Sequence, residues 1–139
     1  MTKFVLDASV SLAWFVDAPI PPFAEHISNL ISRGAKCVVP MLWHLEMANG
    51  LAMAERRGIL NRRDCDHSLG QIEILVKQAI ESDVDSPGLR RAFLMARDYQ
   101  LSAYDAAYLE TAIRLKLPLA TLDKKLAAAA PEAGATLLA

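Results

Sequence analysis

The sequence contains little cysteine, which excludes two common ways of holding a small domain together. Its 139 residues include only Cys37 and Cys65, and these two are not spaced as a Cys-x-x-Cys pair. A disulfide framework or a zinc site needs more Cys or His ligands at close spacing. We therefore expect both residues to be ordinary thiols.

Long hydrophobic runs are absent as well. No stretch approaches about 18 uninterrupted apolar residues, so no membrane span is expected. The opening segment, MTKFVLDASV, has one basic residue and then a short apolar stretch that ends at Asp7. This is too short for the apolar region of a secretory signal. We therefore expect a cytoplasmic protein without membrane contacts.

The chain also has almost no net charge. Fifteen Lys and Arg residues oppose 16 Asp and Glu residues, for a formal charge of −1, so there is no global basic signature of nucleic-acid binding. Such binding is not excluded, because an acidic metal pocket beside a local basic surface would also sum to nearly zero. A short stretch concentrates Arg56, Arg57, Arg62 and Arg63, although solvated helix surface is the simpler explanation of these arginines.

Apolar residues, in contrast, make up 53% of the chain. A chain of this length and composition can bury a substantial core without disulfides. No segment has the composition of a linker. We therefore expect one domain over residues 1–139.

Short apolar segments alternate with helical patterns along the sequence. Strands are expected at residues 3–6, 36–40, 78–84, 117–122 and 135–138. Helices are expected at residues 8–16, 23–33, 41–57, 61–77, 86–100, 104–116 and 123–130, with the fifth of them capped by Ser86 and the third buried on most faces. Short, almost wholly apolar strands that alternate with helices indicate a parallel sheet covered on both faces. The predicted fold is a three-layer α/β/α domain with a central, mainly parallel sheet.

Three acidic residues occur where helices are expected to begin. Asp7 ends the first strand and Asp123 follows the segment LATL, so both should lie at the carboxyl edge of the sheet, where α/β proteins bind ligands. Asp105 comes three residues after Ser102, which is the spacing of a capping box. Helix capping alone is a sufficient alternative explanation for each of these acids.

Glu46 is the acid that capping does not explain. In the segment MLWHLEMANGLAMA the polar side chains are His44, Glu46 and Asn49, and acids are rarely buried without a partner. Asn49 shares a helix face with Glu46 and could orient it. The alternative is a pairing with a distant Arg or Lys.

A single explanation also covers all four acids. A cluster of Asp7, Glu46, Asp105 and Asp123 would repel itself unless a cation neutralised it. Oxygen ligands of this kind suit Mg²⁺ or Mn²⁺. Such an ion can lower the pKa of a water and stabilise the charge that develops on a phosphodiester.

The segments VLDASV, WHLEMANGL, LSAYDAAYLETA and LATLDKKL, in this order and over this length, resemble PIN-domain nucleases. The resemblance is to the VapC-like toxins of bacterial type II toxin–antitoxin pairs. It implies a single PIN-like nuclease domain with Mg²⁺- or Mn²⁺-dependent endoribonuclease activity, on a structured RNA such as tRNA or rRNA. It also implies a homodimer and a small VapB-like antitoxin, for which the helix at 41–54 and the arginine-bearing helix after it are candidate contacts.

The resemblance assigns roles to individual residues. The family's acidic positions, which are catalytic and bind metal, map onto Asp7, Glu46, Asp105 and Asp123. The small hydroxyls and the amide of the family map onto Ser9, Thr121 and Asn49, as contacts to the ligands or the scissile phosphate. Asp7 and Asp105 would bind the ion directly, while Glu46 and Asp123 could act through water. The expected contacts to the RNA backbone are Lys124, Lys125, Arg90 and Arg91.

Other functions fit parts of the same pattern. A haloacid-dehalogenase-type phosphatase also begins with a strand-end aspartate, but it needs a second acid where Ser9 stands. A receiver domain needs paired early acids and a phospho-acceptor aspartate after a middle strand, which are not evident. A non-catalytic PIN-like module that binds RNA or protein remains open, although the presence of all four acids disfavours it.

Overall fold

Four parallel strands form the centre of the protein in the computed structural model, which describes residues 2–85 and 87–139. The strands are β1 (Lys3–Leu6), β2 (Lys36–Pro40), β3 (Ile80–Asp83) and β4 (Leu119–Ala120). Their order across the sheet is β3-β2-β1-β4, with Val5 of β1 paired to Val38 on one side and to Leu119 on the other. The apolar strand residues are buried, as a sheet covered on both faces requires.

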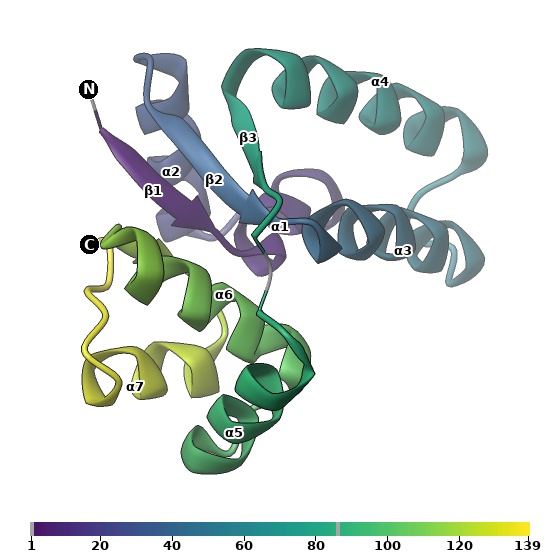
Figure 1. Ribbon diagram of the computed structural model, residues 1–139. Coiled ribbons are helices and arrows are strands. Elements are labelled where there is room, and N and C mark those ends of the chain that lie inside the picture. Colours follow the sequence, from purple (N-terminus) through teal and green to yellow (C-terminus); the bar gives the residue numbers. More distant parts are fainter. Residues whose placement is uncertain (1, 86) are drawn as a thin grey trace.

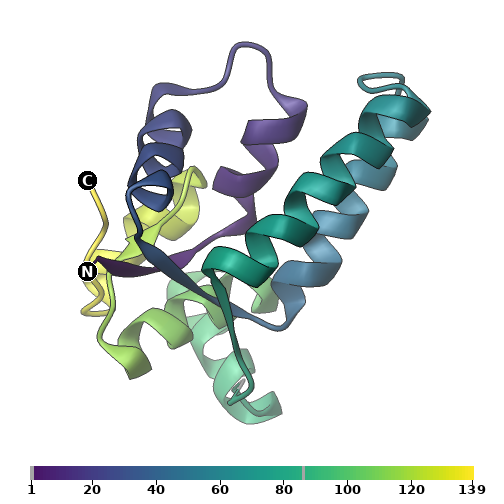
Figure 2. The same ribbon diagram turned by 90° about the horizontal axis from the view of Figure 1, so that it is seen from above.

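Seven helices surround this sheet within the described residues. They are α1 (Ala8–Val16), α2 (Pro22–Ser32), α3 (Leu42–Arg56), α4 (Arg62–Ala79), α5 (Leu89–Tyr99), α6 (Ala103–Leu115) and α7 (Lys124–Glu132). α6 lies below and in front of the sheet in Figure 1, with α5 and α7 beyond it, and Figure 2 shows α1 and α2 on the opposite side. The predicted three-layer α/β/α fold is confirmed. No described helix is long and apolar enough to cross a membrane.

α3 and α4 form a long antiparallel pair that extends from the sheet (Figures 1 and 2). The expectation that α3 is buried on most faces is wrong. Trp43, Met47, Leu51 and Ala54 are buried at helical spacing, whereas the side chain of Leu45 is 76% exposed. Because α3 packs against α1, β2 and α4 and extends beyond the sheet, a single stripe of its surface is covered.

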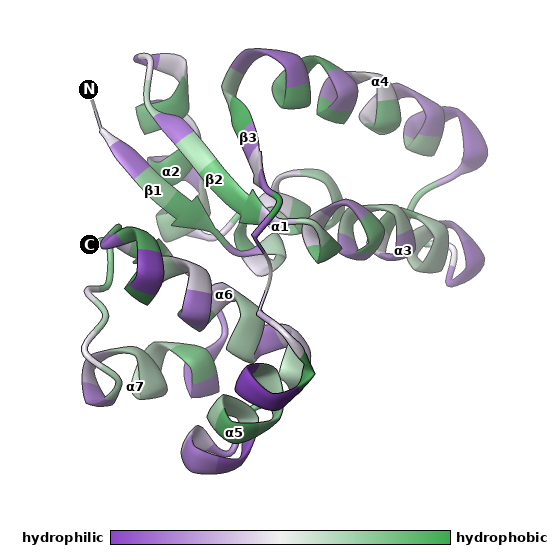
Figure 3. Ribbon diagram, viewed as in Figure 1, coloured by the Kyte–Doolittle hydropathy of each residue, from purple (hydrophilic) through white to green (hydrophobic). Residues whose placement is uncertain are grey.

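Two features at the ends of elements also differ from the sequence prediction. Residues 135–138 do not form a strand, because a single bridge joins Leu137 to Leu119, and β4 itself is only two residues long. The predicted cap Ser86 lies outside the described residues, and α5 instead begins after Gly88. Figure 3 shows hydrophobic positions on α5, and Leu89 and Phe93 on this helix are mostly exposed.

Both cysteines are free, as the sequence predicts, and both are buried. Burial raises the pKa of the Cys37 thiol to about 12, since an apolar interior disfavours the thiolate. A thiol in this state is protonated at neutral pH and contributes to packing as a small apolar group.

The contact between α1 and α3 depends on the absence of a side chain at Gly50. A Cβ at this position would overlap the terminal methyl groups of Leu12 on α1. Gly70, in the middle of α4, has no such neighbour, since a Cβ there would meet nothing within 4 Å. The two glycines therefore differ in packing but share a helical backbone.

We expect opposite effects of the same substitution at these two glycines. Gly70→Ala should stabilise the fold by up to about 1 kcal/mol through helix propensity. Gly50→Ala should lose this gain and lower the free energy of unfolding by about 1 kcal/mol, because Leu12 must move in a packed interface. Urea unfolding of both variants measures the difference. Equal stabilisation would mean that Leu12 is free to rotate.

Candidate active site

The carboxyl edge of the sheet collects the acids that the sequence singles out. Asp7 follows β1 and Asp123 follows β4, and these two strands are parallel neighbours. The backbone N–H of Asp7 donates to the carbonyl of Ala120 at 3.0 Å. Asp105 lies in the first turn of α6, and Glu46 lies near the start of α3. Four elements therefore carry one acid each toward this edge.

The carboxylate of Asp7 is held by two hydroxyl groups. Ser9 Oγ donates to Asp7 Oδ2 at 2.6 Å, and Thr121 Oγ1 donates to the same oxygen at 2.7 Å. Each hydroxyl in turn accepts a backbone N–H at 3.0 Å, from Leu122 and Asp123 respectively. Asp7 has the N-cap position of α1, but its side chain makes no capping hydrogen bond. The capping alternative therefore does not account for this residue.

Asp7 is almost fully buried, and burial is the main reason why its pKa is raised. The hydrogen bonds from Ser9 and Thr121 oppose this shift, and the nearby charge of Asp123 adds to it. Hydroxyl donors stabilise a carboxylate without cancelling its charge. The charged form of Asp7 is therefore disfavoured in the protein alone, and a nearby cation would favour it.

Glu46 is half-buried, and its partner comes from a different helix. The phenol of Tyr108 on α6 donates to Glu46 Oε1 at 2.6 Å. Burial raises the pKa of Glu46, and the charges of Asp7 and Asp105 raise it further. Asn49 is exposed, and no hydrogen bond between it and Glu46 is found in the described part of the chain. Tyr108 was not predictable as this partner, because 62 residues separate it from Glu46.

Asp105 and Asp123 combine a helix cap with a charge in the cluster. Ser102 Oγ accepts the backbone N–H of Asp105 at 3.0 Å, and Asp123 Oδ1 accepts the N–H of Leu126 at 2.9 Å. Burial raises the pKa of Asp105, and the charges of Asp123 and Asp7 act in the same direction. Lys125 opposes them. The two capping contacts expected from the sequence are therefore present.

The chemistry of these donors fits a hard divalent cation. The four acids are oxygen donors, and none of them makes a salt bridge among residues 2–85 and 87–139. In the same residues, no three Asp, Glu, His or Cys side chains are arranged so that they could hold a metal ion. Mg²⁺ commonly binds through one or two carboxylates and keeps several waters. The arrangement fits that kind of binding better than a closed cage of protein ligands.

Comparison with known proteins identifies the family. The family model of the PIN domain matches residues 4–131. The chain belongs to the PIN domain family. Ribonuclease VapC3 of Pyrobaculum aerophilum is 30% identical over 125 residues, which is 90% of this chain and 92% of that protein. The crystal structure of PAE2754 from Pyrobaculum aerophilum matches 91% of this chain and 84% of its own with a TM-score of 0.68 at 23% identity.

A second group of acids in this PIN domain differs from the first, because an arginine neutralises its negative charge. Asp83 at the end of β3 and Glu110 on α6 are both buried, and the guanidinium of Arg114 pairs with both of them. Arg91 of α5 adds a contact to Glu110 at 3.5 Å. Neither Asp83 nor Glu110 belongs to the acids that the sequence pattern singles out. The spacing of Glu110 and Arg114, four residues apart on a helix, was the available signal.

The basic residues that the sequence singles out are exposed at three places. Arg56, Arg57, Arg62 and Arg63 lie where α3 ends and α4 begins. Lys124 and Lys125 begin α7 directly after Asp123, and Arg90 lies on α5 near Arg91. Arg91 is engaged with Glu110, whereas the two lysines are adjacent to the acidic edge.

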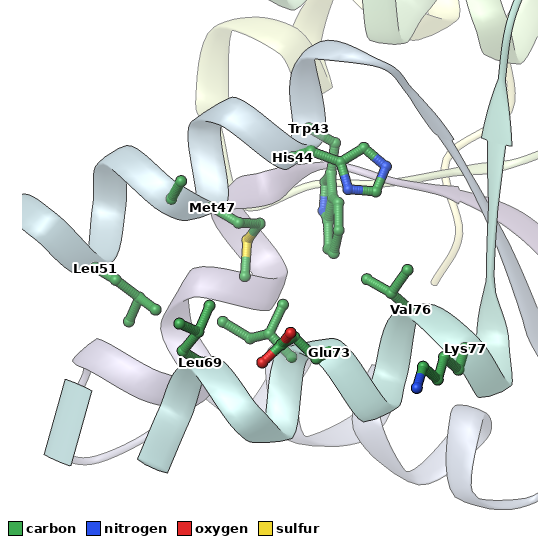
Figure 4. Close-up of a pocket in the computed structure, with 10 residues that line it drawn as sticks. Trp43, His44, Met47, Leu51, Leu69, Glu73, Val76 and Lys77 are labelled. Carbon is green, nitrogen blue, oxygen red and sulfur yellow. The ribbon is translucent and has the colours of Figure 1, made fainter. Parts of the chain in front are cut away.

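A cavity of about 340 Å³ lies between α3 and α4, apart from the acids. Figure 4 shows Trp43, Met47 and Leu51 of α3 facing Leu69 and Val76 of α4 across it. His44 lies at one end and its Nε2 is 2.8 Å from Ser82 Oγ. This lining is mainly apolar and includes the single carboxylate of Glu73, so the cavity does not combine several acids as the carboxyl edge of the sheet does.

The raised pKa of Glu46 predicts a pH-dependent effect of Glu46→Gln in the presence of a chelator. Because the folded pKa exceeds the unfolded one, the contribution of Glu46 to stability is lost as the pH rises through the folded pKa. Gln removes this loss and can still accept the hydrogen bond from Tyr108. We expect the variant to match the parent below about pH 4 and to become the more stable protein toward neutral pH.

Chemical unfolding over this pH range measures the effect, with Glu55→Gln as the control. Glu55 is exposed on the same helix, so this variant reports the effect of removing any glutamate from α3. Indistinguishable pH profiles of the two variants would contradict an unfavourable charge at Glu46.

Loss of Arg114 should destabilise the PIN domain strongly. Arg114→Ala leaves Asp83 and Glu110 buried without their main cation, so we expect a loss of about 3 kcal/mol in unfolding free energy. Lys3→Ala is the control, because Lys3 and Glu81 form an exposed pair at 2.8 Å that should contribute at most about 1 kcal/mol. Urea unfolding compares them, and similar losses would argue against the buried network.

Proposed function

We propose that this PIN-domain chain is a Mg²⁺- or Mn²⁺-dependent endoribonuclease and the toxin of a VapBC-type toxin–antitoxin pair. The observation that carries the proposal is the group of four acids at the carboxyl edge of the sheet. Hydroxyls and backbone groups hold them, and no salt bridge within the described part of the chain neutralises them. Charge of this kind is unfavourable in the protein alone and favourable with a cation present. The similarity to a protein named as a ribonuclease supports the choice of substrate.

The roles of the acids follow from their surroundings. Asp7 and Asp105 would bind the ion directly, and Glu46 and Asp123 would act on it through water. A bound Mg²⁺ or Mn²⁺ would supply a Lewis acid that polarises the phosphodiester and lowers the pKa of the attacking water. Ser9 and Thr121 orient Asp7 through their hydrogen bonds to Oδ2.

The substrate contacts belong to residues around this edge. Asn49, exposed on α3, would contact the scissile phosphate rather than Glu46. Lys124 and Lys125 would bind the RNA backbone beside the acids, with Arg90 and Arg91 as further contacts. The expected substrate is a structured RNA such as tRNA or rRNA.

The proposed cellular context is that of a toxin. A small VapB-like antitoxin would bind and inhibit the chain, which would itself form a homodimer in the cytoplasm. The exposed apolar residues of α3, together with the arginines at the start of α4, are the surface that we propose for the antitoxin.

The direct test is Asp7→Asn in an RNA cleavage assay. The amide oxygen can still accept the hydrogen bonds from Ser9 and Thr121, so the fold should persist, but the amide N–H₂ group would face the cation. We expect cleavage in Mg²⁺ or Mn²⁺ to fall by about 100-fold or more, since a metal ion contributes several kcal/mol to the transition state. Chelator should abolish the activity of the parent, and added ion should restore it.

Asp66→Asn, at an exposed position on α4, is the matched control and should cleave like the parent. A folded Asp7→Asn variant that cleaves as fast as the parent would refute the proposed role of the acids. RNA binding by the parent without cleavage, and without thermal stabilisation by Mn²⁺, would instead support a non-catalytic binding module.

A further inference from the structure

Tyr108 connects α6, which carries Asp105, to α3, which carries Glu46. It lies on α6 one turn after Asp105, and its side chain is fully buried in the core. Its hydroxyl reaches α3, where it donates to Glu46 Oε1 at 2.6 Å. Because the aromatic ring is fixed by packing, the position of the hydroxyl is fixed by the fold rather than by the site.

We propose that Tyr108 is a positioning residue of the active site, whose hydroxyl holds Glu46 by Oε1 and keeps its carboxylate directed at the other acids. This inference rests on the function proposed above, in which Glu46 takes part in binding a divalent ion. It assigns to Tyr108 a role through Glu46, without any contact between Tyr108 and RNA.

Glu46 needs such a restraint because its neighbours repel it. The charges of Asp7 and Asp105 both act on this side chain, which is only half-buried and could turn toward solvent. A glutamate has several rotatable bonds, so an unrestrained side chain would adopt many positions. One strong hydrogen bond from a rigid donor selects a single position.

The nature of the donor distinguishes this contact from an ion pair. Arg114 holds Glu110 on the same helix α6 by a salt bridge at 2.7 Å, which neutralises that carboxylate. Tyr108 instead supplies a neutral donor, which leaves the carboxylate of Glu46 without a protein cation and available to a bound one. Tyr108 engages Oε1, and no hydrogen bond to Oε2 is found in the described residues. Glu46 thus has one restrained and one available oxygen.

The test is Tyr108→Phe, which keeps the ring and removes only the hydroxyl. We expect kcat for RNA cleavage to fall, and the Kd for Mn²⁺ measured by calorimetry to rise, each by about 10-fold to 100-fold, as for other residues that orient metal ligands. KM for RNA should not change, because Tyr108 is buried. Tyr104→Phe is the matched control, since Tyr104 lies on the same helix and is 66% exposed.

Each outcome separates this inference from the proposed function. If Tyr108→Phe retains the parental kcat and Mn²⁺ affinity while Asp7→Asn is inactive, the positioning role is wrong and the proposed function survives. If the parent neither cleaves RNA nor binds Mn²⁺, both are wrong. Equal losses in Tyr104→Phe and Tyr108→Phe, or a change confined to KM, would also overturn the positioning role.

A second measurement needs no substitution of Tyr108. The chain has three tyrosines, and 3-fluorotyrosine labelling gives each a ¹⁹F resonance that Tyr99→Phe and Tyr104→Phe assign by elimination. We expect Mg²⁺ to shift the resonance of Tyr108 in a saturable manner, because the ion and the phenol share Glu46. A resonance that does not respond to Mg²⁺, in a chain that binds the ion by calorimetry, would overturn the proposal.

Discussion

The pair of hydrogen bonds that Ser9 and Thr121 donate to Asp7 joins the two ends of the chain at the site. Both hydroxyls donate a hydrogen bond to Asp7 Oδ2, and both accept a hydrogen bond from a backbone N–H of the turn after β4. The turn that precedes α7 is therefore fixed to the residues that follow β1. Through this turn the position of Asp123 depends on Asp7, whose carboxylate has hydroxyl partners rather than a cation.

The same fold treats its two groups of acids differently. At the acidic edge, neutral hydroxyls hold Asp7 and Glu46. At the end of β3, Arg114 neutralises Asp83 and Glu110. A buried ion pair fixes helices and strands together, whereas a buried carboxylate with neutral donors keeps a charge that a ligand can use. The choice of donor, rather than the presence of acids, therefore separates a structural cluster from a candidate site.

Local sequence patterns sufficed for most of the fold. Short apolar segments and the capping residues Ser102 and Asp123 placed the elements, because these signals act over a few residues. The contacts of Tyr108 with Glu46 and of Arg114 with Asp83 were not predictable, since they join residues far apart in the chain. The exposure of Leu45 was missed because periodicity shows which residues are apolar but not which face finds a partner.

Asp105 and Asp123 can each belong to a helix cap and to the site at the same time. From the sequence alone, capping and metal binding were two alternative explanations for these acids. At Asp105 the cap is the hydrogen bond from the backbone N–H of Asp105 to Ser102 Oγ, so the side-chain carboxylate takes no part in capping. At Asp123 the cap uses Oδ1, which leaves Oδ2. A cap fixes the first turn of a helix, and the first turn fixes the depth of the acid it carries. The two caps therefore hold the carboxylates of Asp105 and Asp123 at the edge of the sheet.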